Sequence, residues 1–76
     1  MRWEYVATGV EGNCQLFGAN IFDYEWESTG NRIKVKDPAY GQVHVMTVYR
    51  VKINEEFYTF AAGEFSNMIW GFYLPF

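Results

Sequence analysis

Apolar and polar residues alternate one by one along most of this 76-residue chain, and a period of two is typical of β-strands. The longest such run covers residues 42–53. Its predicted core face carries the odd-numbered residues Val43, Val45, Thr47, Tyr49, Val51 and Ile53. Eleven extended residues would span ~36 Å, well above the usual strand length. We therefore expect this strand to bend and to serve two sheets.

The most specific pattern predicts a β-hairpin. Three aromatic residues alternate with three carboxylates in residues 21–27, and two aliphatic residues alternate with three cations in residues 32–36. A turn signal, Thr29-Gly30-Asn31, separates the two segments. A two-residue turn places Glu27 opposite Lys34, and a four-residue turn shifts the pairing by two residues while keeping acid opposite base. A one-residue slip would break both the charged and the apolar pairs.

The rest of the chain also predicts strands and turns. Further strands are expected at residues 2–8, 14–17, 57–62 and 68–76, loops or turns at 9–13, 37–41 and 54–56, and at most one short helical turn near 63–67. We expect a single all-β domain over residues 1–76, a small antiparallel barrel or sandwich of six or seven strands. Its size class is that of SH3-like and OB-like domains, an analogy at fold level that carries no function.

The C-terminal segment, residues 68–76, is apolar on both faces. Met68, Trp70, Phe72 and Leu74 fall on one face, and Ile69, Gly71 and Tyr73 on the other. A strand of this kind must be covered on both sides. The cover is either the rest of the chain, including Trp3 and Tyr5, or another protein.

Composition limits how so small a domain can be stabilised. Cys14 and His44 are the only residues of their types, so neither an internal disulfide nor a Cys/His zinc set can form. Aromatic residues make up 21% of the chain, and stability must come from ring burial or from self-association. The sequence has no apolar run of ~20 residues for a membrane span and no secretory signal after Met1. We expect a small cytoplasmic protein.

No residue pattern indicates a reaction site. Asp23, Glu25 and Glu27 share a predicted strand face opposite cations, which lower carboxylate pKa values and are wrong for an acid catalyst. His44 lies on a polar strand face with no orienting acid signalled by the sequence. Cys14 is best interpreted as a small buried thiol. No glycine-rich phosphate loop is present. We expect no enzyme activity, no cofactor and no metal.

Net charge is −3 and the sequence pI is about 4.9, which argues against a general nucleic-acid binder. Basic side chains nevertheless concentrate in the middle of the chain. An alternative function is therefore single-stranded nucleic-acid binding through Arg32, Lys34, Lys36, Arg50 and Lys52. Neighbouring carboxylates, and aromatic rings that point to the core face, argue against this alternative.

The leading hypothesis is a non-enzymatic protein that acts by protein–protein contact, as a homodimer or with another protein. Interfaces are enriched in aromatic residues and methionine and depleted in charge, and the C-terminal segment has all three properties. The predicted contact residues are Met68, Ile69, Trp70, Phe72 and Tyr73.

Overall fold

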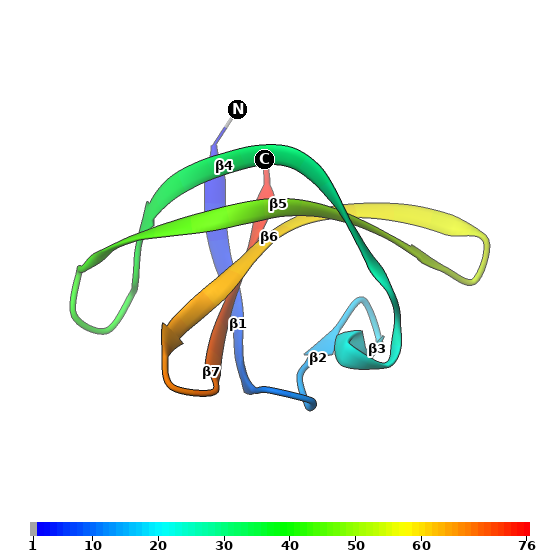
Figure 1. The fold of residues 1–76 in the computed structure, drawn as a ribbon, viewed down its shortest axis with the longest axis horizontal. Coiled ribbons are helices and arrows are strands. Elements are labelled where there is room, and N and C mark those ends of the chain that lie inside the picture. Colours follow the sequence, from blue (N-terminus) through cyan, green and yellow to red (C-terminus); the bar gives the residue numbers. More distant parts are fainter. Residues whose placement is uncertain (1) are drawn as a thin grey trace.

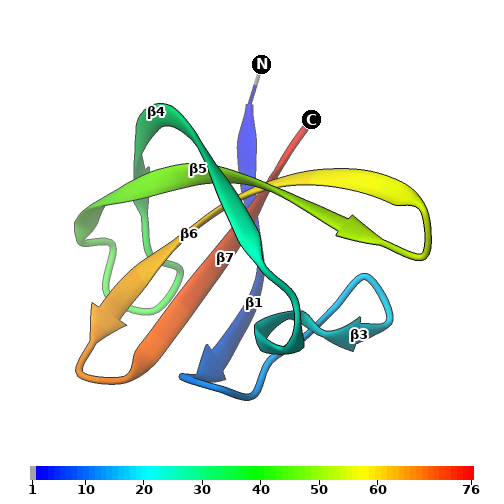
Figure 2. The same cartoon turned by 45° about the vertical axis from the view of Figure 1, so that its right-hand side comes forward.

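The structure is a computed structural model that describes residues 2–76, and it confirms an all-β antiparallel fold. Five strands form one sheet in the order β1-β7-β6-β5-β4, and β2 pairs with β3 in a separate ribbon. The strands are β1 (Trp3–Val10), β2 (Gln15–Leu16), β3 (Ala19–Asn20), β4 (Trp26–Lys36), β5 (Val43–Ile53), β6 (Glu56–Ser66) and β7 (Ile69–Pro75). In Figures 1 and 2, β4, β5 and β6 arch over β1 and β7, so the sheet is strongly curled.

The hairpin predicted over residues 21–36 is wrong. Ile21–Asp23 form a short 3-10 helix, η1, and Trp26–Lys36 form one continuous strand that pairs with β5. The Asn20 side chain accepts a hydrogen bond from the Phe22 N–H and so caps η1. This turn is the one helical element of residues 2–76, and it does not lie near residues 63–67, which belong to β6 except for Asn67.

The supposed reverse turn is a bulge within β4. The pairing register shifts between Ser28 and Arg32. Thr29 Oγ1 donates a hydrogen bond of 2.9 Å to the Val48 carbonyl, and Gly30 has a φ of +84°, which glycine adopts at little cost. The turn signal therefore marks a local irregularity within β4. The strand pairs with β5 on both sides of it, and the chain does not reverse there.

Strand β5 has the predicted length but contributes to both faces of the sheet. Val51 and Ile53 are buried on one face, as predicted, whereas Met46 and Val48 are buried on the opposite face. The core assignment of Val43 and of Val45 is wrong, because they are 59% and 58% exposed. Pairing of β5 with β6 ends at Thr47, so Val43 and Val45 pair with β4 alone.

The first core is an aromatic cluster between the sheet and the β2–β3 ribbon with η1. Trp26 is at its centre. Its ring centroid lies 5.1–5.8 Å from those of five other rings: Phe22, Tyr49, Phe60, Trp70 and Phe72. The indole Nε1 donates a 2.9 Å hydrogen bond to the Ile21 carbonyl. This bond fixes η1 against the sheet and satisfies the polar atom of a half-buried ring.

The second core lies on the opposite face of the sheet and contains Met46, Val48, Ala61 and Tyr73. Trp3 packs against it, and the Tyr5 ring meets the Tyr73 ring edge-on at 5.9 Å. Strand β7 is thus covered on both faces by the chain itself, with β1 as its neighbour. Of the two alternatives that the sequence left open, the structure shows the cover supplied by the chain, with Trp3 and Tyr5 taking part. No helix within residues 2–76 is long and apolar enough to cross a membrane.

Candidate protein-contact surface

Strands β1 and β4 are the two edges of the five-stranded sheet. Edge strands expose backbone N–H and C=O groups that can pair with another chain, and proteins usually protect them with charge, proline or bulges. Strand β4 carries Glu27, Arg32, Lys34 and Lys36 as well as its bulge. Strand β1 carries Glu4, which pairs with Arg2 at 2.7 Å, and a bulge at Val6, and Asn13 bridges its end at Val10. It has no charge between Tyr5 and Val10. It is the less protected edge.

The backbone of β1 presents four residues to the outside of the sheet. Arg2 and Phe76 exchange two backbone hydrogen bonds, and the Glu11 N–H donates to the Met68 carbonyl. Opposing residues of an antiparallel pair alternate between hydrogen-bonded and non-hydrogen-bonded positions, so Glu4 and Gly9 also face β7. The residues that direct their N–H and C=O groups away from β7 are Trp3, Tyr5, Thr8 and Val10.

The bulge at Val6 sets this spacing. The register moves from Tyr5 opposite Tyr73 to Ala7 opposite Phe72, which leaves Val6 as the extra residue. The outward set is therefore odd-numbered before the bulge and even-numbered after it. On this outer side, Asn13 of the same chain forms an antiparallel bridge with Val10, and its N–H donates to the Val10 carbonyl at 2.8 Å. Among residues 2–76, the outward residues of β1 that no strand or bridge pairs are Trp3, Tyr5 and Thr8.

Apolar side chains accompany this open edge. Val10 is 52% exposed, and Tyr5 and Val6 are also exposed. Met68, in the two-residue turn between β6 and β7, is 47% exposed and has a φ of +62°. Tight turns require this conformation, and Phe17, Asn54 and Glu55 also adopt it. Glu11 ties this turn to the end of β1 through the bond between its N–H and the Met68 carbonyl, at 2.7 Å.

The predicted contact residues divide between core and surface. Phe72 and Tyr73 are 0% and 2% exposed and lie in the two cores of the single chain, where they offer no surface to a partner. Trp70 is half-buried, and its Nε1 donates to the Glu11 carboxylate at 3.1 Å. Ile69 is half-buried opposite Val10 of β1. Only Met68 of the five is exposed.

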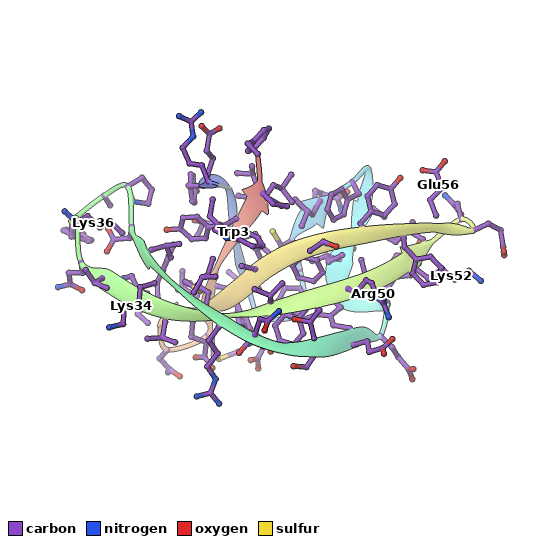
Figure 3. The ribbon with its side chains drawn as sticks, turned by 90° about the horizontal axis from the view of Figure 1, so that it is seen from above. Trp3, Lys34, Lys36, Arg50, Lys52 and Glu56 are labelled. Atoms are coloured by element: carbon purple, nitrogen blue, oxygen red, sulfur yellow. The ribbon has the colours of Figure 1, made fainter. Side chains whose placement is uncertain are left out.

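The five predicted nucleic-acid residues do not share one face. Arg32, Lys34 and Lys36 pair with odd-numbered residues of β5, whereas Arg50 and Lys52 are even-numbered and so point to the opposite side. Figure 3 shows Lys34 and Lys36 at one end of the molecule and Arg50 and Lys52 at the other.

Carboxylates and one ring already contact the second basic pair. Arg50 lies 3.6 Å from the Glu27 carboxylate, and Lys52 lies 3.4 Å from that of Glu55. Both cations also lie 5.6 Å from the centroid of the exposed Phe57 ring. Glu27 thus faces Arg50 of β5. The two hairpin registers instead place Lys34 or Arg32 opposite it. Within residues 2–76, no group of three or more His, Cys, Asp or Glu side chains is arranged to hold a metal ion.

His44 has an orienting acid, which corrects the sequence-based expectation. Its Nε2 lies 2.9 Å from the Asp37 carboxylate, which also accepts hydrogen bonds from the backbone N–H groups of residues 39–42. The bonds from Tyr40 and His44 are the main reasons why the pKa of Asp37 falls to about 2. The sequence did not indicate the pair of Asp37 and His44, because the two residues lie seven positions apart in different predicted elements. Its evident effect is to close the β4–β5 loop.

A groove of about 490 Å³ lies between this loop, β1 and the β6–β7 turn, and it includes Tyr5, Thr8, Tyr40, His44 and Phe65 in its lining. The Phe65 ring packs 4.9 Å from that of His44.

Cys14 lies elsewhere and is 5% exposed, which confirms the buried thiol, and burial raises its pKa. Nothing in residues 2–76 places Cys14 beside His44.

No protein-family model matches the chain, and comparison with curated proteins and with solved structures gave no significant match. The functional argument therefore depends on the geometry of the chain itself. The open edge of β1 is the part that sequence reasoning missed. Its signal was the uncharged run from Tyr5 to Val10, but a pattern alone does not say which strand lies at an edge.

Proposed function

We propose that this protein acts by protein–protein contact, and that it self-associates by adding the open edge of β1 to a second copy. The observation that carries the proposal is the set of outward N–H and C=O groups of Trp3, Tyr5 and Thr8. They lie on an edge that lacks charge from Tyr5 to Val10. Strand addition of this kind gives affinity through main-chain hydrogen bonds, and the exposed side chains beside it add specificity.

Exposed apolar surface supports the same edge. Val6, Val10 and Met68 are all exposed close to β1 and would lose contact with water in such a pairing. A single strand pair is a small interface, so we expect a reversible association in the micromolar range or weaker. The nucleic-acid alternative has less support, since its five cations fall on two faces of the sheet.

Molar mass in solution tests the proposal. Light scattering after size exclusion, from micromolar to millimolar concentration, should give a mass that rises from 8.9 kDa towards twice that value. Val6→Lys should keep the chain monomeric, because it places a solvated charge in the middle of the edge.

Val45→Lys is the matched control. It makes the same substitution at another exposed valine, which lies on β5, beside the opposite edge strand β4. This variant should associate as the wild type does. A wild-type mass of 8.9 kDa at every concentration would refute self-association. Equal effects of the two lysines would mean that the β1 edge is not the contact.

A further inference from the structure

We infer that a second contact surface lies where β4 and β5 approach their connecting loop, and that it binds an acidic, extended segment of another protein. The surface, called the basic face here, consists of Arg32, Lys34 and Lys36 of β4 with Val43 and Val45 of β5. It is separate from the β1 edge, so the inference goes beyond self-association and does not depend on it.

Strand pairing places these side chains on one face of the sheet. Lys34 lies opposite Val45, and Lys36 lies opposite Val43. Directly opposed residues of an antiparallel pair project to the same side, and Arg32 follows the same alternation along β4. All five residues are exposed. Figure 3 shows Lys34 and Lys36 together at one end of the molecule.

The cations of the basic face differ from the other cations of the chain. Arg2, Arg50 and Lys52 each lie within 3.6 Å of a carboxylate oxygen. No salt bridge within residues 2–76 involves a cation of the basic face, and none of these three side chains donates a hydrogen bond there. Half of the six Lys and Arg residues therefore carry charge that the described chain does not compensate locally.

The carboxylates of the chain are mostly engaged already. Of the nine Asp and Glu side chains, all except Glu25 accept a hydrogen bond or form an ion pair within residues 2–76. A second copy thus offers few free carboxylates to the basic face. The surplus of uncompensated cations favours an anionic partner that is a different protein.

The two valines narrow the class of partner. Charge on an edge strand also protects it from unwanted pairing, but that role does not account for Val43 and Val45, which are 59% and 58% exposed. Protein interfaces combine such apolar groups with a charged rim. Proteins that bind single-stranded nucleic acid stack bases on aromatic rings, and the basic face contains no ring.

The spacing of the cations indicates an extended segment. Alternate residues of a β-strand recur about every 6.6 Å on one face, which is the arrangement of Arg32, Lys34 and Lys36. A partner segment in extended conformation has the same repeat. Acidic residues at every second position would therefore meet all three cations at once, and apolar groups beside them would cover the valines.

An NMR titration with a short peptide of alternating glutamate and valine tests the inference. Binding should have a Kd of about 0.1–1 mM at low salt and should weaken as salt screens the exposed charges. The largest amide shifts should occur in residues 32–36 and 43–45. The same peptide with glutamine in place of glutamate should not bind. A titration without shifts in these residues would overturn the inference.

Replacing all three cations of the basic face by glutamine should weaken peptide binding at least about tenfold, because three ion pairs are lost. The matched control is the triple variant Arg2→Gln, Arg50→Gln and Lys52→Gln, which removes the same total charge elsewhere and should weaken binding less than about twofold. Circular dichroism checks that both variants fold. Equal losses in the two triple variants would show that net charge, and not this face, determines binding.

Two further titrations separate the alternatives. A single-stranded oligothymidylate should bind more weakly than the acidic peptide, and tighter binding through the same amides would overturn the partner class in favour of nucleic acid. Val6→Lys, which is expected to abolish self-association, should bind the acidic peptide as the wild type does. Loss of peptide binding in Val6→Lys would contradict a basic face that acts independently of the β1 edge.

Discussion

At the scale of single residues, the first core depends on a few fully enclosed rings. Phe60 is 0% exposed and meets the rings of Phe17, Trp26, Tyr49 and Phe72. The alternation of residues 57–62 beside that of residues 42–53 predicts that Tyr58 meets Val51 and that Phe60 meets Tyr49, and the structure has this register. The local pattern succeeds here because a two-residue turn, Asn54-Glu55, joins the strands without a bulge.

Phe60→Ala should lower the free energy of unfolding by about 3–5 kcal/mol, because it leaves a cavity among rings that cannot close over it. Phe57→Ala is the matched control on the same strand. The Phe57 ring is 64% exposed, and the cationic groups of Arg50 and Lys52 lie 5.6 Å from its centroid. It should cost about 1 kcal/mol or less. Urea unfolding measures both, and similar costs would contradict the burial described for β6.

Asp37 gives a defined dependence of stability on pH. Its pKa is lowered in the folded state from 3.8 to about 2, so its contribution to stability is present above pH 4 and is lost as pH falls from about 4 to 2. Asp37→Asn should be less stable at neutral pH and should lose part of the acid dependence in that window.

Urea midpoints of the wild type and Asp37→Asn between pH 2 and 6 measure this effect. Glu55→Gln, which neutralises a 91% exposed carboxyl side chain, is the control. Parallel curves for wild type and Asp37→Asn would show that the carboxylate does not hold the loop.

At the scale of elements, alternation predicted where strands lie better than which strands pair. The two halves of residues 21–36 are complementary in charge and shape, yet β4 pairs with β5, where Glu27 meets Arg50 and Trp26 meets Val51. Such complementarity of side chains does not specify a unique partner strand. Likewise, β5 follows one alternation but has buried residues on opposite faces at its two ends, because the two cores cover different halves of it.

Pairing of β6 with β7 depends on a glycine in the second core. A Cβ at Gly71 would overlap the ring of Phe65, which packs over it from β6. Gly71→Ala should therefore cost about 1–3 kcal/mol. In the Phe65→Ala background the same substitution should cost much less, because the obstructing ring is gone. A double-mutant cycle in urea measures this coupling, and additive effects would contradict the contact.

At the scale of the whole molecule, the fold class and the need to cover both faces of the C-terminal strand follow from the sequence, because they require only the period of two and the absence of polar faces. The number of strands agrees with the prediction although β4 replaces two predicted strands, since β3 was not predicted. The order of strands in the sheet does not follow from it, and the order makes β1 an edge. For this reason the exposed surface that is available for contact differs from the one that the sequence predicts. Phe72 and Tyr73 are covered by the chain's own strands, and exposed surface remains beside them at β1 and Met68.

Amide hydrogen exchange of β1, resolved by NMR at low and high protein concentration, tests the central claim most directly. The outward N–H groups of Tyr5 and Thr8 should exchange readily in the dilute monomer and become protected at high concentration, when they bond to the second copy. The N–H groups of Glu4 and Gly9, which face β7, should be protected at both concentrations. Tyr5 and Thr8 amides that exchange equally fast at both concentrations, while the mass doubles, would show that the chain associates through a different surface.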